Sequence, residues 1–139
     1  MKVLAIDYGT VRVGLSISDP SEKITLALPL YEWQDDGNDA ARLAGIAEEQ
    51  GAEEIVVGLP INMDDTIGPS AERVLAFVEE LKMFSPVPIV TYDERLSTEQ
   101  AKGKLRDIEM SRRKKRDHLN TVAAQVILEA YLEARRTQK

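Results

Sequence analysis

Residues 3–18 have the sequence VLAIDYGTVRVGLSIS, which predicts two β-strands joined by a tight turn. The segments Val3–Ile6 and Val11–Ser18 are rich in the branched apolar residues that favour strands. Between them lies Tyr8-Gly9-Thr10, where glycine allows the backbone to reverse direction. A third strand over Ile24–Leu30 follows the turn-forming Asp19-Pro20-Ser21. The chain is therefore expected to begin with an antiparallel three-strand meander.

The pattern changes to alternating helices and strands after Asn38. A helix capped by Asp39 is predicted to end near Gly51, and a second helix capped by Ser70 to continue through Leu81. The buried strands expected beside these helices are Glu54–Val57 and Ile89–Tyr92. Such an alternation favours parallel pairing. Two further helices are predicted, one from Ser97 through Leu105 and a terminal one that starts near Asp117 and carries apolar residues through Tyr131.

Length and composition indicate one α/β domain over residues 1–139, because single cores commonly occupy roughly 100 to 200 residues. No apolar run reaches the roughly 20 residues that a membrane span requires. Asp7 interrupts the apolar N-terminal stretch, which argues against a signal peptide and favours a cytoplasmic protein without membrane contact. Because the chain has no cysteine and one histidine, disulfides, thiolate sites and the usual zinc sites are excluded, and any metal must bind oxygen.

Carboxylates follow two of the predicted strands. Asp7 ends the first strand, Asp93 and Glu94 follow Ile89–Tyr92, and Asp117 opens the final helix, whose positive end stabilises an anion. Clustered carboxylates need a neutralising cation, and Mg²⁺ or Mn²⁺ suits oxygen ligands and a phosphodiester substrate. Two such ions, roughly 4 Å apart, can activate water and stabilise the leaving oxygen. The alternatives are a turn role for Asp7 and a cap role for Asp117. For Asp93 they are pairing with Arg95 or capping of the following helix.

Three segments together resemble the YqgF family, also called RuvX, from Met1 to about Glu133. They are residues 5–14, with Asp7-Tyr8-Gly9-Thr10, Arg12 and Gly14, then residues 56–64, with Gly58-Leu59-Pro60, and residues 92–98, with Asp93-Glu94-Arg95. The resemblance implies an RNase H-like fold with a mixed five-stranded sheet flanked by helices. It also implies a nuclease that matures the 5′ end of pre-16S ribosomal RNA during ribosome biogenesis. Related Holliday junction resolvases instead cut branched DNA.

Carried over from this resemblance, Asp7 is the first metal ligand and Glu94 the second, with Asp93 as a possible addition. Many family members have an acid shortly before the Ala-Ala of the terminal helix, where this chain has Asn120. Asparagine can offer a carbonyl oxygen but brings no charge. Asp117 lies three residues earlier, on about the same helical face, and is the expected third catalytic and metal-binding carboxylate, with Asn120 assisting.

The nucleic-acid partner is expected to contact positive side chains near these acids. The run Arg112, Arg113, Lys114, Lys115 and Arg116 concentrates five charges in a chain of net charge −6, and the alternative for it is a solvated loop. Arg12 and Arg95 could contact phosphate or balance the carboxylates. Tyr8, Tyr92 and Trp33 could stack on bases, although packing is the default for each. His118 could transfer a proton, with a structural role as its default.

Two other functions compete with the nuclease. The segment Asp7-Tyr8-Gly9-Thr10 also resembles the phosphate hairpin of the actin and sugar-kinase class, but those enzymes close two lobes about ATP and this chain has the length of one. The second alternative is a non-catalytic nucleic-acid-binding module, in which Asn120 marks a lost metal site.

Overall fold

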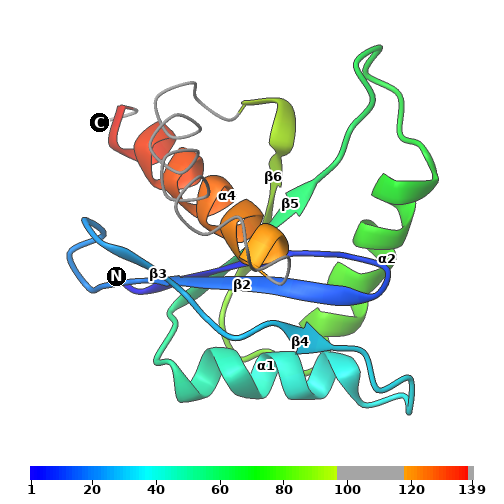
Figure 1. Cartoon of the computed structure of the whole chain (residues 1–139), viewed down its shortest axis with the longest axis horizontal. Coiled ribbons are helices and arrows are strands. Elements are labelled where there is room, and N and C mark those ends of the chain that lie inside the picture. Colours follow the sequence, from blue (N-terminus) through cyan, green and yellow to red (C-terminus); the bar gives the residue numbers. More distant parts are fainter. Residues whose placement is uncertain (97–117, 138–139) are drawn as a thin grey trace.

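The computed structural model describes residues 1–96 and 118–137, and over these residues a mixed sheet is covered by helices on both faces (Figure 1). The strands are β1 Val3–Asp7, β2 Arg12–Ser18, β3 Thr25–Ala27, β4 Tyr31–Glu32, β5 Glu54–Leu59 and β6 Ile89–Asp93. The helices are α1 Asp39–Glu49, α2 Pro69–Lys82, the single 3₁₀ turn η1 Glu94–Leu96, and α4 His118–Thr137. The predicted helix from Ser97, the basic run Arg112–Arg116 and Asp117 lie outside the described residues.

The sheet has the strand order β3-β2-β1-β5-β6. β1, β2 and β3 pair antiparallel, whereas β5 pairs parallel with both β1 and β6. The predicted combination of a three-strand meander and two parallel strands is therefore confirmed. The short strand β4, which the sequence analysis did not anticipate, pairs with the beginning of β2. The predicted third strand was too long, since β3 ends at Ala27 and Pro29 has no amide hydrogen to continue the ladder.

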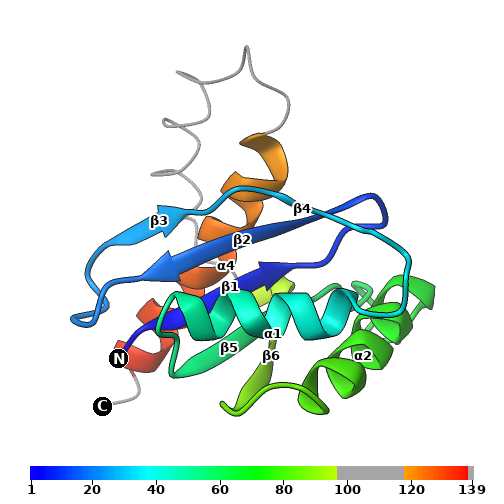
Figure 2. The ribbon, with the colours of Figure 1, turned by 90° about the horizontal axis from the view of Figure 1, so that it is seen from below.

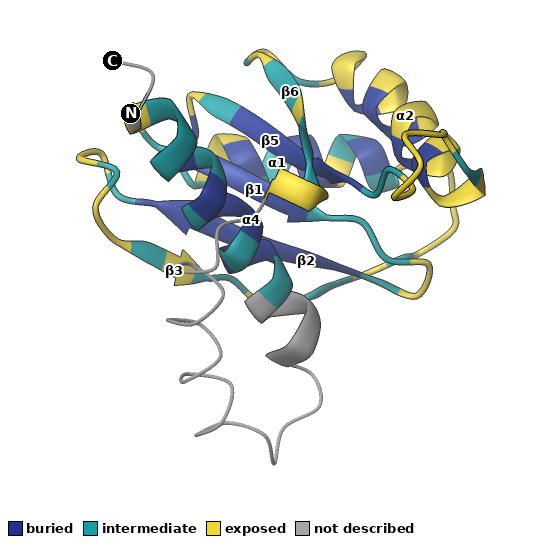
Figure 3. Ribbon diagram, turned by 90° about the horizontal axis from the view of Figure 1, so that it is seen from above, coloured by how far each residue is buried: buried dark blue, intermediate teal, exposed yellow. Residues whose placement is uncertain are grey.

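β1 occupies the centre of the sheet and contributes to two cores, because successive side chains of a strand point to opposite faces. Leu4 and Ile6 are fully buried against the side covered by α1 and α2 (Figure 2). Val3 and Ala5 are fully buried in the second core, which α4 covers with Leu128 and other apolar residues (Figure 3). The side chains of residues 3–7 point alternately to the two faces of the sheet. The same alternation determines which face the next side chain along the strand reaches.

Both predicted helix caps were wrong by one or two residues. The N-cap of α1 is Asn38, and Asp39 lies in the first turn. The Asp39 carboxylate accepts hydrogen bonds from the backbone N–H groups of Gln34 and Asp35, at 2.9 and 3.1 Å, so it closes the preceding loop. The N-cap of α2 is Gly68, and Pro69 occupies the first helical position, where its fixed φ is favourable and its missing N–H costs nothing. Ser70 therefore lies inside the helix.

Polar contacts at its C-terminal part fix α4 against the sheet. The Arg135 guanidinium donates to Glu54 Oε1 at 2.9 Å and to Glu22 Oε1 at 2.6 Å. Thr25 Oγ1 in β3 donates to Glu129 Oε1 at 2.8 Å. These contacts join the terminal helix to both the meander and β5. In the part of the chain that the structure describes, no helix has the length and apolar character to cross a membrane.

Candidate active site

Asp7 lies at the C-terminal end of β1, where the alternation of the strand directs it to the α4 side of the sheet. Its partner in β2 is Gly14, and the residue next to it in β5 is Gly58, because Ile6 is in register with Val57. A half-buried carboxylate thus stands between two positions without side chains. This arrangement places the Asp7 carboxylate beside the bare backbone of both neighbouring strands.

Glu94 reaches the same place from η1, the turn that follows β6. A Cβ atom built on Gly58 would lie 3.0 Å from Glu94 Oε1 and 3.2 Å from its Cδ. The same Cβ would lie 2.5 Å from Ile127 Cδ1 of α4. The Glu94 carboxylate therefore rests on the bare backbone of β5 beside the terminal helix, and a side chain at position 58 would displace it. This role of Gly58 could not be seen in the sequence, where the residue stood out only as part of the family motif.

Burial and mutual repulsion define the electrostatics of this pair. The pKa of Asp7 is raised to about 7, first by burial and then by the charge of Glu94. Burial also raises the pKa of Glu94, and the charge of Asp93 adds to the effect. Two carboxylates that disfavour each other's ionisation fit a divalent cation, which would remove both penalties and prefers oxygen ligands. The structure thus brings together two of the three predicted ligands, Asp7 and Glu94.

A complete metal centre is not assembled by the described residues alone, among which no group of three or more His, Cys, Asp or Glu side chains could hold an ion. The predicted third ligand, Asp117, lies outside them. Asn120 lies in the first turn of α4, and its predicted assisting role stays a prediction.

Asp93 occupies a different position from Glu94. Val90 and Tyr92 of β6 pack in the α4-side core, so the alternation directs Asp93 away from it. Its carboxylate accepts hydrogen bonds from the Arg95 backbone N–H at 2.9 Å and from the Arg95 guanidinium at 2.8 Å. The hydrogen bond from Arg95 is also the main cause that lowers the pKa of Asp93. Of the predicted alternatives to a metal contact, the structure shows both pairing of Asp93 with the Arg95 guanidinium and a cap-like hydrogen bond to the backbone of η1.

Arg95 joins the turn that carries Glu94 to the loop 60–68 between β5 and α2. Besides Asp93, its Nη1 donates to the Asn62 carbonyl at 3.0 Å and to Asp65 Oδ1 at 2.7 Å. The hydrogen bonds to Asp93 and Asp65 raise the pKa of Arg95 further above its usual value. We call this set of contacts, Arg95 with Asp93, Asn62 and Asp65, the Arg95 clamp. Of the two roles predicted for Arg95, phosphate contact and charge balance of carboxylates, these contacts correspond to the second.

The remaining candidates are placed as follows. Arg12 is the half-buried first residue of β2, opposite Glu32 of β4. Tyr92 packs edge-to-face on Tyr131, with ring centroids 5.9 Å apart, and its hydroxyl donates to the Leu96 carbonyl at 3.0 Å. The default of packing is therefore confirmed for Tyr92. The basic run Arg112–Arg116 stays a prediction, since the structure does not describe it.

Comparison with known proteins places this arrangement in a family. The family model described as "RuvX: Holliday junction resolvase" matches residues 1–134. A protein of Desulforamulus reducens named "Putative pre-16S rRNA nuclease" is 38% identical over 134 residues, which cover 96% of this chain and 98% of the relative. A protein of Caldanaerobacter subterraneus with the same name is 36% identical over 137 residues, covering 98% and 99% of the two chains.

Solved structures with low sequence identity share the fold. The RuvC structure of Thermus thermophilus superposes with a TM-score of 0.66 at 16% identity and covers 99% of this chain and 97% of its own. The fowlpox virus Holliday junction resolvase has a TM-score of 0.61 at 10% identity, covering 96% and 99%. These likenesses confirm the predicted RNase H-like fold class, because they extend over nearly the whole of both chains.

Proposed function

From the membership of this chain in the RuvX family, we propose that it is a metal-dependent nuclease that hydrolyses phosphodiester bonds. The relatives named as pre-16S rRNA nucleases, of nearly the same length, make the 5′ end of pre-16S ribosomal RNA the favoured substrate. Branched DNA is the second substrate class, since the family model carries the name of a Holliday junction resolvase. We place this activity in the cytoplasm and in a single domain over residues 1–139.

The observation that carries the proposal is the Asp7–Glu94 pair at the end of β1. Two half-buried carboxylates with raised pKa values lie where neither Gly14 nor Gly58 supplies a competing side chain. Asp7 and Glu94 would hold Mg²⁺ or Mn²⁺, which supplies charge neutralisation and a nucleophilic water at neutral pH. The protein contributes the placement of the two oxygen donors, with Ile127 of α4 packed beside them over Gly58.

Other residues would complete the site. Asp117 would add the third carboxylate and Asn120 a neutral oxygen. Arg12 and the run Arg112–Arg116 would contact phosphates and so provide affinity that falls with salt. These assignments rest on the sequence and on the position of Arg12 at the start of β2, the strand beside Asp7.

The test is cleavage by the purified full chain of pre-16S RNA, single-stranded RNA and branched DNA, with Mg²⁺, Mn²⁺ or a chelator. Asp7→Asn removes a ligand charge but keeps the side-chain size, so we expect the rate to fall by more than the roughly 10- to 100-fold that outer-shell partners of metal ligands contribute. The matched control is Asp36→Asn, on an exposed aspartate that pairs with Arg42 in the loop before α1 and is not one of the proposed ligands.

Two outcomes would contradict the proposal. Unchanged turnover by the Asp7→Asn variant would show that Asp7 is not a metal ligand needed for cleavage. Tight binding of RNA without cleavage in either metal would favour the non-catalytic binding module instead.

A further inference from the structure

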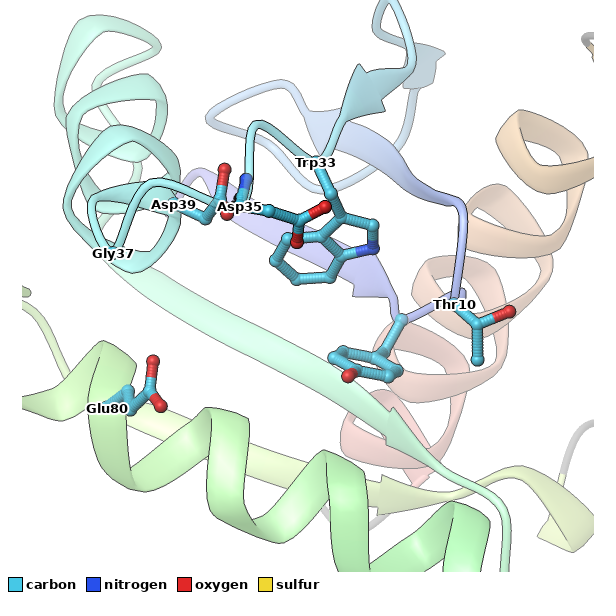
Figure 4. A pocket seen from close by; sticks show the side chains of 7 residues that line it. Thr10, Trp33, Asp35, Gly37, Asp39 and Glu80 are labelled. Atoms are coloured by element: carbon cyan, nitrogen blue, oxygen red, sulfur yellow. Dashed lines mark hydrogen bonds between the residues drawn. The ribbon is translucent and has the colours of Figure 1, made fainter.

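Two adjoining pockets open beside Tyr8 and Trp33, on the side of the sheet opposite Asp7. Figure 4 shows the side chains that line the first of them. Their volumes are about 220 and 230 Å³, and Tyr8, Trp33 and Glu80 line both of them. Tyr8 follows Asp7 directly, and Thr10, which lines the first pocket, lies in the same turn between β1 and β2. The pockets therefore begin at the strand end that carries the proposed metal ligand. Nothing in the proposed chemistry of Asp7 and Glu94 uses them.

Trp33 is held in a fixed orientation. Its Nε1–H donates to the Gly9 carbonyl at 2.7 Å, and its ring lies 5.4 Å from Tyr8 and 5.7 Å from Phe77 between centroids. Tyr31 adds an edge contact at 6.2 Å. Although these contacts anchor it, Trp33 is half-buried and still lines both pockets. The result is an aromatic side chain of fixed orientation in the lining of both pockets.

The polar lining of the first pocket is anionic. Asp39 is already engaged by backbone N–H groups and by the Tyr31 hydroxyl. Asp35 and Glu80 are exposed and reach the pocket from the loop before α1 and from α2 (Figure 4). Carboxylates accept hydrogen bonds from N–H groups and repel phosphate oxygens. The first pocket thus favours a planar aromatic group that presents N–H donors and disfavours a backbone phosphate, whereas Arg73 of α2 adds a cation to the lining of the second pocket.

We propose that the two pockets form a binding site for one unstacked nucleobase that presents N–H donors, with guanine preferred, on the same strand as the phosphate that is cut. Single-stranded nucleic acids are commonly read in this way, by aromatic stacking and hydrogen bonds to the Watson–Crick edge. Guanine offers an imino and an amino N–H side by side to one carboxylate, whereas uracil offers a single imino N–H. The inference rests on the proposed nuclease function, because it assigns a base preference to that substrate.

The test uses Trp33 as its own reporter, since it is the single tryptophan of the chain. Tryptophan fluorescence of the full chain is titrated with guanosine, GMP, AMP, CMP, UMP and inorganic phosphate. Stacking on Trp33 should quench the emission, and guanosine and GMP should bind roughly 5- to 100-fold more tightly than UMP. Phosphate alone should leave the emission unchanged. The same comparison on a uridine oligonucleotide with and without one guanosine should show the preference in a strand.

Variants separate this site from the metal site. Glu80→Gln should reduce the guanine preference, because an amide accepts less strongly, while Glu79→Gln on the same helix should not, since Glu79 is absent from both pocket linings and contacts Lys82. Asp7→Asn should leave the quenching intact even if it abolishes cleavage. The quenching assay therefore tests the nucleobase site independently of the proposed nuclease activity.

Three results would overturn the inference. The first is no saturable quenching by any nucleotide or by the guanosine oligonucleotide. The second is equal affinity for all four nucleotides. The third is stronger quenching by an arginine amide than by GMP, which would assign the pockets to a cationic side chain of a protein partner.

Discussion

At the scale of single residues, the candidate site depends on a side chain that is missing. The Glu94 carboxylate and Ile127 both occupy the space that a Cβ atom at position 58 would need. Gly58 is therefore a positioning residue for Glu94. This role comes from packing between β5, η1 and α4, three elements that the sequence separates by tens of residues.

Gly58→Ala should lower metal-dependent cleavage by roughly 10- to 100-fold, because it displaces a ligand without removing it. Overpacking against Ile127 should also lower the free energy of unfolding by about 1–3 kcal/mol. The matched control is Gly45→Ala in α1, where an added Cβ would have no neighbour within 4 Å. That variant should keep its activity and gain up to about 1 kcal/mol from helix propensity. Full activity of Gly58→Ala would place the Glu94 carboxylate elsewhere during catalysis.

The raised pKa of Asp7 predicts how stability of the metal-free protein depends on pH. Its value changes from 3.8 to about 7 on folding, so the folded state binds the proton more tightly than the unfolded state. The resulting stabilisation is complete below about pH 4 and is lost as the pH rises through about 7. Denaturant unfolding in chelator should therefore show lower stability near pH 8 than near pH 5, and Asp7→Asn should flatten this difference. Added Mg²⁺ should raise stability mainly at the higher pH, because it binds the ionised carboxylates.

The two carboxylates of the site could be identified from the sequence, but the roles of the neighbouring residues Asp93 and Gly58 could not. Asp7 and Glu94 were found because acids after strand ends in a known motif carry a strong signal. Asp93 could not be distinguished from Glu94 by spacing alone, since the end of β6 and its following turn decide which face each side chain reaches. The function of Gly58 was not visible either, because no local pattern reports that Glu94 and Ile127 converge on it.

At the scale of elements, η1 is a short turn that a single guanidinium connects to another loop. The Arg95 clamp joins it to residues 62–65 through the Asn62 carbonyl and the Asp65 carboxylate, and to the end of β6 through the Asp93 carboxylate. Because η1 also carries Glu94, the clamp fixes the segment from which a proposed metal ligand extends. Its contacts are largely at the surface, where ion pairs contribute little to stability. We therefore expect its main effect on activity.

Arg95→Lys should reduce kcat by roughly 10- to 100-fold and change the free energy of unfolding by about 1 kcal/mol or less, because lysine cannot reproduce the planar fork. Metal titration should show weaker binding, which a purely structural role would leave unchanged. Arg42→Lys is the control, since Arg42 pairs in the same way with Asp36 in an exposed loop remote from η1. A flatter salt dependence of RNA affinity with unchanged kcat would instead make Arg95 a phosphate contact.

Element prediction succeeded where the pattern was long and periodic. The strands β1, β2, β5 and β6 and the helices α1 and α2 lie where the apolar spacing placed them. The errors concern short features that depend on particular partners. β4 exists because Val13 pairs with Tyr31, and Asp39 serves the loop before α1 instead of the helix N-cap. Tertiary contacts determine whether such a short strand forms and which residue caps a helix, and local propensity does not report these contacts.

At the scale of the whole molecule, α4 unites segments that are distant in the sequence. Arg135 contacts Glu22 in the turn before β3 and Glu54 at the start of β5, and its guanidinium lies 5.1 Å from the Tyr131 ring centroid. The Arg135 side chain is 23% exposed, so solvent screens these ion pairs less than it screens fully exposed ones.

Arg135→Met should lower the free energy of unfolding by about 1–3 kcal/mol, because Glu54 loses its charged partner and Glu22 keeps only the N-terminal ammonium group. Lys82→Met, which removes an exposed contact to Glu79, should change it by no more than about 0.5 kcal/mol. Thermal or denaturant unfolding of both variants measures the difference. Equal effects would show that the terminal helix is held by its apolar face alone.

The division of the interior into two cores has a consequence for synthesis on the ribosome. The core shared with α1 and α2 uses residues up to Ile89, whereas among the residues that the structure describes the opposite face of β1 and β5 is covered by α4 residues from 127 on. While α4 is still inside the ribosome, the nascent chain therefore exposes Val3, Ala5 and Val56 to its surroundings. Since domains fold as units during translation, we expect the native state to form only after the final helix has emerged. Until then, the exposed apolar strands are a binding site for a chaperone that holds unfolded chains.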